Sequence, residues 1–361
     1  MDLLATNSLK KHFCLAALSL LLTLLFSGCQ IGYLIQSATG EISILWHRVD
    51  AKDALKNPKI SDEDKRKIAL AQEARAFAET EMKLVASKSY SAYVALDRPY
   101  VSYVVSAAPK WQLKHYTWSF PFVGEVPYKG FFNEQDAKEE TQALQAQGLD
   151  TYQRGVSAFS TLGWFNDPLL SSMLQYSDHD LVNTIIHETT HATLYIKSSS
   201  DFNERLAVFV GNLGTEKFYR AREGEDSPTV KRIHQENEDE KLFSEFISHE
   251  IENLDHWYQT NPPQIEADRT QKFKALQEKF KTEIQPKMQT DLYARLPEVQ
   301  LNNARLLLYK TYVSDLSLFQ RLYEASNKDM TVFLNHCKDL EKHPQPEQGL
   351  KDLLNALTTK K

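Results

Sequence analysis

The sequence predicts a predominantly helical α+β fold that contains a small sheet. Apolar residues recur at spacings of three and four between residues 61 and 85 and again between residues 181 and 196, as amphipathic helices require. Residues 101–106 are instead rich in Val, Tyr and Ser, a composition that favours a strand. Two long charged segments, residues 230–258 and 265–285, the first with an apolar stripe, predict that long helices build the carboxyl-terminal half.

Residues 1–28 have the layout of a bacterial lipoprotein signal. Two lysines at positions 10 and 11 precede an apolar run, residues 13–26, which is too short for a comfortable membrane span. Small residues before Cys29 close the run, so we expect cleavage there and a lipid on that cysteine. A plain signal anchor is the alternative. By resemblance to such signals, Gln30 in place of Asp favours the periplasmic side of the outer membrane.

The chain after the signal, residues 29–361, is expected to form a single domain stabilised by its core. With Cys29 lipidated, Cys337 is the one remaining thiol of this part, so no intramolecular disulfide can form there. Removal of the signal takes away two lysines and one aspartate, which changes the formal charge from −6 to −7. A mildly acidic chain without basic clusters gives no support for nucleic-acid binding.

The elements that follow the signal are expected to alternate between helices and short strands. Residues 42–55 predict a short helix, and residues 61–85 predict a stronger one that opens with acidic residues. A strand at 101–106 is followed by residues 118–132, which contain too many Pro and Gly for a helix and are expected to form irregular strands and turns. A helix at 134–147 stops at the glycine that follows.

The segment Asn183–Thr193 carries the pattern His-Glu-x-x-His at His187, Glu188 and His191. Residues four apart on a helix lie on one face, one turn apart, so both imidazoles can reach a single metal ion. Glu188 lies about 100° round the helix, where it suits the general base that takes a proton from a zinc-bound water. The pattern indicates a zinc hydrolase. The alternative is a pair of surface histidines on an ordinary amphipathic helix.

A zinc site of this kind needs a third protein ligand. Asp178 or Asp180 is expected to cap the helix that carries the histidines, and Asn203 to cap a second helix with Glu204 in its first turn. Glu204 is the expected third ligand, because Glu216 lies about 18 Å further along a continuous helix and the two carboxylates cannot share one ion. Small residues would let the second helix pack closely on the first: Ala207, Gly211 and Gly214.

Residues 156–162 are predicted to form a strand framed by glycines, just before the helix that carries the histidines. An extended peptide can pair with the edge strand of a sheet beside a metal, so this strand is a candidate shelf for substrate backbone. An interior strand without substrate contact is an equal alternative.

The two long helices at 230–258 and 265–285 are predicted to be antiparallel, because an Asn-Pro-Pro turn separates them. His249 and His256 lie seven residues apart on the first of these helices, among many charged residues. A solvated face is therefore favoured there over a second metal site.

Residues 301–312 predict an apolar helix that carries a polar stripe. Four side chains fall within an arc of roughly 80°: Asn302, Arg305, Tyr309 and Tyr312. The stripe is expected to line the cleft, where a phenol could donate to a developing oxyanion. Asn303 faces elsewhere and is expected to be structural.

Five segments together make the sequence similar to a bacterial family of predicted aminopeptidases, zinc-site proteins that are often lipoproteins. They are Tyr128-Lys-Gly-Phe-Phe, Ala158-Phe-Ser-Thr-Leu-Gly-Trp-Phe-Asn-Asp-Pro, Ile186-His-Glu-Thr-Thr-His, Phe202-Asn-Glu-Arg-Leu-Ala and Leu301-Asn-Asn-Ala-Arg-Leu. The similarity runs along nearly all of the chain after the signal. Thr189 and Thr190 stand where the family more often has Leu-Ala, and Ser119 and Glu125 where Cys is common.

The resemblance implies a zincin-like metallopeptidase domain, zinc as the cofactor, a peptide as the substrate and Tyr312 as the catalytic phenol. The residues themselves indicate a zinc hydrolase, and with the resemblance the expected reaction is peptide hydrolysis, in which Glu188 takes the proton of a water and returns it to the leaving amine. A lipid-anchored scaffold with a structural zinc site is the alternative. A structural site is usually closed by four protein ligands, whereas His187, His191 and Glu204 leave one position open, which favours the enzyme.

Overall fold

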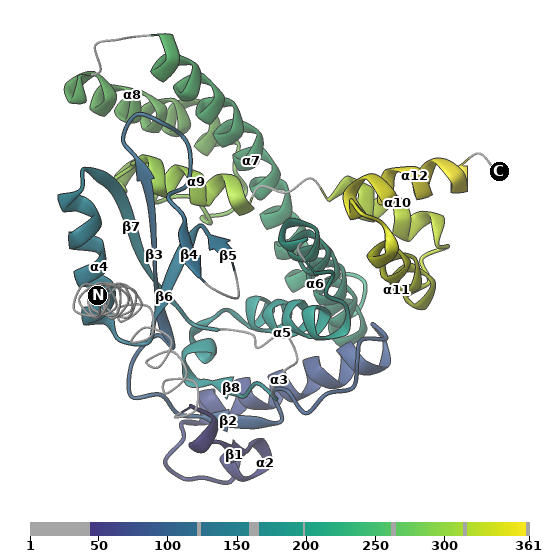
Figure 1. The fold of residues 1–361 in the computed structure, drawn as a ribbon. Helices are drawn as coiled ribbons and strands as arrows, with labels where there is room; N and C mark the ends of the chain where they lie inside the picture. The colour runs from purple at the N-terminus through teal and green to yellow at the C-terminus, as the bar shows by residue number, and fades with distance from the viewer. Residues whose placement is uncertain are drawn as a thin grey trace, which may run out of the picture.

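Helices make up most of the chain, and short strands form small sheets beside them (Figure 1). This is the mainly helical α+β architecture that the sequence predicts. The computed structural model describes residues 44–120, 124–158, 166–197, 199–260, 265–312 and 316–358. The predicted signal and Cys29 lie outside these ranges. In the described part, no helix combines the length and the apolar character needed to cross a bilayer.

The first sheet joins three short strands in the order β1-β2-β8, namely β1 (Val49–Asp50), β2 (Ala92–Val94) and β8 (Leu169–Leu170). The β1/β2 pair is antiparallel and the β2/β8 pair is parallel. The prediction of a helix at 42–55 is therefore wrong at its centre, because Val49 pairs with Tyr93 and only the four residues of α2 (Ala51–Ala54) are helical after it. This pairing lies far away in sequence, so local periodicity does not reveal it.

Helix α3 (Asp62–Thr80) is the predicted strong helix, and it ends earlier than expected. The Ser61 hydroxyl caps it by accepting a hydrogen bond from the Asp64 N–H, and acidic residues fill its first turn. After Thr80 the chain turns, and the Val85 N–H donates to the Thr193 hydroxyl at 2.9 Å. The segment after α3 is thereby tied to the end of the helix that carries the histidines.

The second sheet is antiparallel, in the order β6-β3-β7, and comprises β3 (Ser102–Pro109), β6 (Tyr128–Phe131) and β7 (Leu149–Val156). Strands β4 (Trp118–Phe120) and β5 (Gly124–Val126) form a separate hairpin, and α4 (Glu134–Ala146) packs on β3 and β7. The sequence did not predict most of β7, which spans 149–156 and pairs with all of β3. Of the predicted strand at 156–162, Val156 ends β7, and Ser157 and Ala158 lie outside any strand. Residues 159–165 lie outside the described part.

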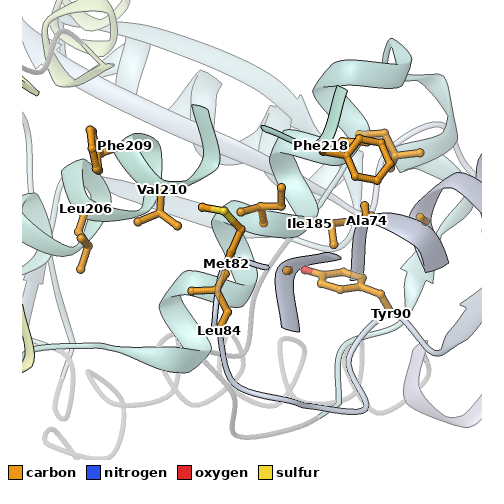
Figure 2. Close-up of a cluster of buried hydrophobic side chains, with 14 of the residues drawn as sticks. Ala74, Met82, Leu84, Tyr90, Ile185, Leu206, Phe209, Val210 and Phe218 are labelled. Carbon is orange, nitrogen blue, oxygen red and sulfur yellow. The ribbon is translucent and has the colours of Figure 1, made fainter. Parts of the chain in front are cut away.

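The main core lies where α3, α5 (Asp178–Thr193) and α6 (Ser200–Glu223) pack together. Figure 2 shows the apolar side chains of this cluster, which come from α3 and the segment after it, from α5 and from α6. Those labelled are Ala74, Met82, Leu84, Tyr90, Ile185, Leu206, Phe209, Val210 and Phe218. This core therefore fixes α5 and α6 relative to each other before any polar contact is considered.

The long helix α7 (Pro228–Thr260) crosses the molecule and pairs with α8 (Glu266–Lys279), which continues into a π-helical turn at Phe280–Ile284 (Figure 1). The prediction of an antiparallel pair is confirmed. The centres of the Phe246 and Phe280 rings are 5.7 Å apart, and the Lys279 ammonium donates to the Glu250 carboxylate at 2.5 Å. Further along α7, the Tyr258 hydroxyl accepts from Arg269 Nε at 3.3 Å. Later residues of α7 thus contact earlier residues of α8, as an antiparallel pair requires.

Helix α9 (Asn303–Tyr312) packs between α7 and the β3/β7 pair, and the chain closes with α10 (Ser317–Ala325), α11 (Met330–Asp339) and α12 (Pro346–Thr358). Short 3₁₀ turns complete the described elements, at Ser171–Gln175, Gln285–Lys287, Leu296–Glu298 and Leu340–Lys342. Aromatic side chains dock α10 on α6, with the Phe319 ring 5.2 Å from the Phe202 ring.

Asn303 lies at the centre of a buried polar network that joins α9 to α7, α8 and the sheet. It is fully buried, and its side-chain oxygen accepts from the Tyr258 hydroxyl at 2.8 Å. Its amide nitrogen donates to backbone carbonyls of the chain that leaves β3. Its backbone N–H donates to Asp150, whose carboxylate is paired with the buried Arg269 guanidinium. This arrangement agrees with a structural role for Asn303.

Replacement of Asn303 by Ala should destabilise the fold by about 2 to 4 kcal/mol, because it leaves the Tyr258 hydroxyl and buried carbonyls without their partner. Urea unfolding would measure the loss. The exposed Asn335, in the middle of α11, offers a matched control, and its change to Ala should alter stability by less than about 0.5 kcal/mol. Equal losses in the two variants would contradict a structural role for the network.

Candidate metal centre

Helix α5 begins at Asp178, and Ser177 directly before it is the cap residue. The Ser177 hydroxyl accepts a hydrogen bond from the Asp180 N–H at 3.2 Å and also donates to the Asp180 carboxylate at 2.7 Å. The expectation that Asp178 or Asp180 caps the helix is therefore wrong, and both instead place negative charge in its first turn. The helix ends at Thr193, and Leu194 already has extended backbone angles.

Helix α6 begins earlier than the sequence suggests. Its cap residue is Ser199, and Asn203, the expected cap, lies inside the helix. The Asn203 side chain bonds the strand-like segment before α6 instead, accepting from the Ile196 N–H at 2.9 Å and donating to the Ile196 carbonyl at 2.8 Å. Glu204 consequently lies in the second turn of α6 rather than the first.

Close contact between α5 and α6 depends on two glycines, as predicted. A methyl group added at Gly211 would lie 3.1 Å from the Asn183 amide oxygen and 3.4 Å from the His187 Cβ. One added at Gly214 would lie 3.0 Å from two carbon atoms of the Ile186 side chain. Larger residues at these positions would force the helices apart.

This packing brings together the three side chains that the sequence singles out. His187 Nε2 and His191 Nε2 are 3.2 Å apart, and they lie 3.6 Å and 3.4 Å from the two carboxylate oxygens of Glu204. Ligands about 2.0 to 2.1 Å from a tetrahedral zinc ion are separated by about 3.3 Å. The three side chains therefore form a group that could hold a metal ion, and their spacing and donor types fit zinc.

The group combines a buried imidazole, that of His191, with an accessible carboxylate, that of Glu204. His191 is 4% exposed and His187 is 18% exposed, whereas the Glu204 side chain is 57% exposed. Partial burial alone would raise the pKa of Glu204, but hydrogen bonds from His187 and His191 outweigh it and lower that pKa to about 2. Glu204 is therefore ionised at neutral pH, as a ligand must be. His191 Nδ1 is buried and has no hydrogen-bond partner among the described residues.

Glu188 is half-buried on the same helix, and its carboxylate makes no hydrogen bond or ion pair with another described residue. Its negative charge affects the pKa of two tyrosines. Burial, followed by the Glu188 charge, raises the pKa of Tyr90. Burial also raises the pKa of Tyr176, and the Glu188 charge adds to this while a hydrogen bond with Ser157 opposes it. An available carboxylate thus lies one residue from a proposed ligand.

The polar stripe of α9 meets strand β7. The Asn302 amide donates to the Thr151 carbonyl at 2.9 Å, and Arg305 Nε donates to the Tyr309 hydroxyl at 3.2 Å. Tyr312 ends α9, but its side chain lies outside the described part of the chain. Its catalytic role therefore stays a prediction.

The sequence analysis missed Tyr195 and assigned Asn203 a different role. Asn203 clamps Ile196, as described above, and Tyr195 lies with its ring centre 6.3 Å from that of His191. The spacing of four residues between His191 and Tyr195 was the available signal. It carries weight only once the chain is known to leave α5 in an extended conformation at that point.

Residues 32–351 match the profile of a family described as "Putative aminopeptidase". The chain belongs to this family. No curated protein and no solved structure matches the chain. The match confirms the family that the sequence resembles, and the description of that family associates the chain with peptide hydrolysis.

Replacement of Glu204 by Gln should weaken zinc binding by roughly tenfold or more, because an amide oxygen is a poorer ligand than a carboxylate. Competition with a chromophoric chelator would measure the affinity. Glu216→Gln is the matched control on the same helix, since Glu216 is paired with Arg220 and His234 instead. Zinc affinity that stays unchanged in Glu204→Gln would remove Glu204 from the site.

Proposed function

We propose that this member of the aminopeptidase family is a zinc-dependent peptide hydrolase with its active site at His187, His191 and Glu204. The observation that carries the proposal is the set of separations of 3.2, 3.4 and 3.6 Å among donor atoms from two helices. Glu188 lies next to one of these donors without a competing partner in the described chain.

Three protein donors leave a position for water or substrate, which is typical of catalytic zinc sites, whereas structural sites usually have four. Zinc bound there would act as a Lewis acid that polarises a carbonyl group and acidifies water. Cys337 of α11 is the thiol of the described chain, and it is enclosed in the main apolar core. Burial raises its pKa, so it is no candidate for a fourth ligand. The arrangement therefore favours an enzyme over a scaffold.

The role proposed for Glu188 follows from its position. A carboxylate with no committed partner can accept the proton of the attacking water and deliver it to the leaving amine. His187, Glu188 and His191 all lie on α5, so the base and the two histidine ligands are held by one rigid helix.

The peptide substrate is proposed to lie along strand β7. The sheet order β6-β3-β7 gives β7 no second strand neighbour among the described residues. Ser157 follows β7 and is hydrogen-bonded to Tyr176, whose pKa is raised by burial and by the Glu188 charge. The end of β7 therefore runs toward Glu188, and an extended peptide paired with this edge would approach the proposed metal centre. The candidate shelf is thus moved from 156–162 to the part of β7 after Thr151, because the Thr151 carbonyl already accepts from the Asn302 amide.

The envelope location is a further part of the proposal. Residues 29–361 are proposed to form one zincin-like domain, held by a lipid on Cys29 at the periplasmic side of the outer membrane. The charged start, short apolar run and small residues before Cys29 support it.

Replacement of Glu188 by Gln should lower peptidase turnover by on the order of a hundredfold or more while zinc content and folding are retained, since an amide cannot accept the proton. Cleavage of a peptide library by the zinc-loaded protein, read by mass spectrometry, would measure it. An aminopeptidase should release single residues from free but not from acetylated peptides.

The scaffold alternative makes the opposite prediction for the same variant. If the wild-type protein, fully loaded with zinc, cleaves nothing across the library, or if Glu188→Gln cleaves as fast as wild type, the proposed function fails. Glu216→Gln again serves as a control for the general effect of losing one carboxylate.

Replacement of Cys29 by Ser should abolish lipid labelling and release the protein from the membrane fraction, because the lipid would be the main source of membrane affinity. Metabolic labelling with a palmitate analogue and fractionation would test this. Membrane fractionation that persists in the variant would instead indicate a signal anchor or a protein partner.

A further inference from the structure

The segment that leaves α5 places one exposed tyrosine beside His191 of the proposed metal centre. Leu194 has extended backbone angles, with φ −147° and ψ 120°, so side chains alternate along the segment. Leu194 and Ile196 are buried, at 8% and 4% exposure, whereas Tyr195 between them is 40% exposed. Tyr195 therefore projects away from the core.

This segment is held firmly at both ends. The Asn203 side chain bonds both the N–H and the carbonyl of Ile196, at 2.9 and 2.8 Å. On the other side, the Thr193 hydroxyl donates to the Thr189 carbonyl at 2.7 Å and accepts from the Val85 N–H. Asn203 immediately precedes Glu204, so the residue that fixes the Tyr195 segment also lies next to a proposed ligand.

The Tyr195 ring lies edge-on to the His191 ring, with 6.3 Å between ring centres and 66° between ring planes. The phenol makes no hydrogen bond to another described residue and is accessible to solvent. The other two tyrosines near the motif are less suited to touch a substrate. Tyr90 is only 2% exposed, and the Tyr176 hydroxyl is hydrogen-bonded to Ser157.

Peptide hydrolysis places negative charge on the carbonyl oxygen of the scissile bond, and a hydrogen-bond donor aimed at that oxygen accelerates the reaction. We propose that Tyr195 is this donor, a catalytic residue whose phenol contacts the substrate oxygen beside His191. The inference rests on the proposed function. It assigns to Tyr195 the role that the resemblance suggests for Tyr312.

The test is Tyr195→Phe in the full chain loaded with zinc, since this change removes the hydroxyl and retains the ring that packs on His191. We expect kcat to fall by on the order of a hundredfold, with KM and zinc content unchanged. Tyr128→Phe, at an exposed tyrosine of β6, is the control and should leave kcat unchanged. Undiminished kcat in Tyr195→Phe would overturn the assignment, as would a fall matched by loss of zinc.

A second measurement does not depend on turnover. A phosphinic dipeptide with a free amino group mimics the tetrahedral, negatively charged transition state, so Tyr195→Phe should weaken its binding by the same factor as kcat/KM falls. Binding of the dipeptide product should stay unchanged. Equal phosphinic affinity in wild type and variant overturns the inference. A wild type that binds the phosphinic peptide but cleaves nothing contradicts the proposed function, and the role of Tyr195 is then decided by the affinity ratio alone.

Discussion

The close approach of α5 and α6 is the constraint on which the proposed site depends. At Gly211 a methyl group would already lie 3.4 Å from the Cβ of His187, and at Gly214 it would press on Ile186. Because protein interiors are packed as densely as crystals, a bulkier residue there would separate the helices. Glu204 would then move away from the imidazoles, since the histidines and the carboxylate belong to different helices. Backbone proximity, rather than any polar contact, thus sets the geometry of the group.

The helix pair is supported on two sides by elements far away in sequence. Helix α3 contributes to the core beneath α5 and α6, as Figure 2 shows, and the residues after it bond the end of α5. On the other side, the Phe319 ring of α10 packs on α6, and the Arg205 guanidinium pairs with the Glu347 carboxylate of α12 at 2.8 Å. Arg205 follows Glu204 directly, so the last helices of the chain help to position a proposed ligand although none of their residues belongs to the proposed metal centre.

Local patterns predicted that His187, His191 and Glu204 lie together, but they did not predict how the strands of the sheet pair. The spacing of His187 and His191 is a property of a single helix, so the sequence could place both imidazoles on one face. Glu204 was also expected beside the histidines, but the start of its helix was predicted wrongly. Helix α6 begins at Ser200, and Asn203 does not cap it, because the Asn203 side chain bonds Ile196 in the segment before the helix. Most of strand β7 was not predicted, because its residues become a strand through pairing with β3, more than forty positions earlier for most of its length. Tyr195 was missed for a similar reason, since its exposure follows from how the chain leaves α5.

The central claim is that His187, His191 and Glu204 bind one zinc ion and leave a position for the reaction. Anomalous diffraction at the zinc absorption edge, from crystals of the zinc-loaded protein, tests it most directly. The account predicts one peak about 2.0 to 2.2 Å from both Nε2 atoms and from a Glu204 oxygen, with a non-protein ligand in the remaining position. No peak at this place, or an ion closed in by four protein ligands, would contradict it.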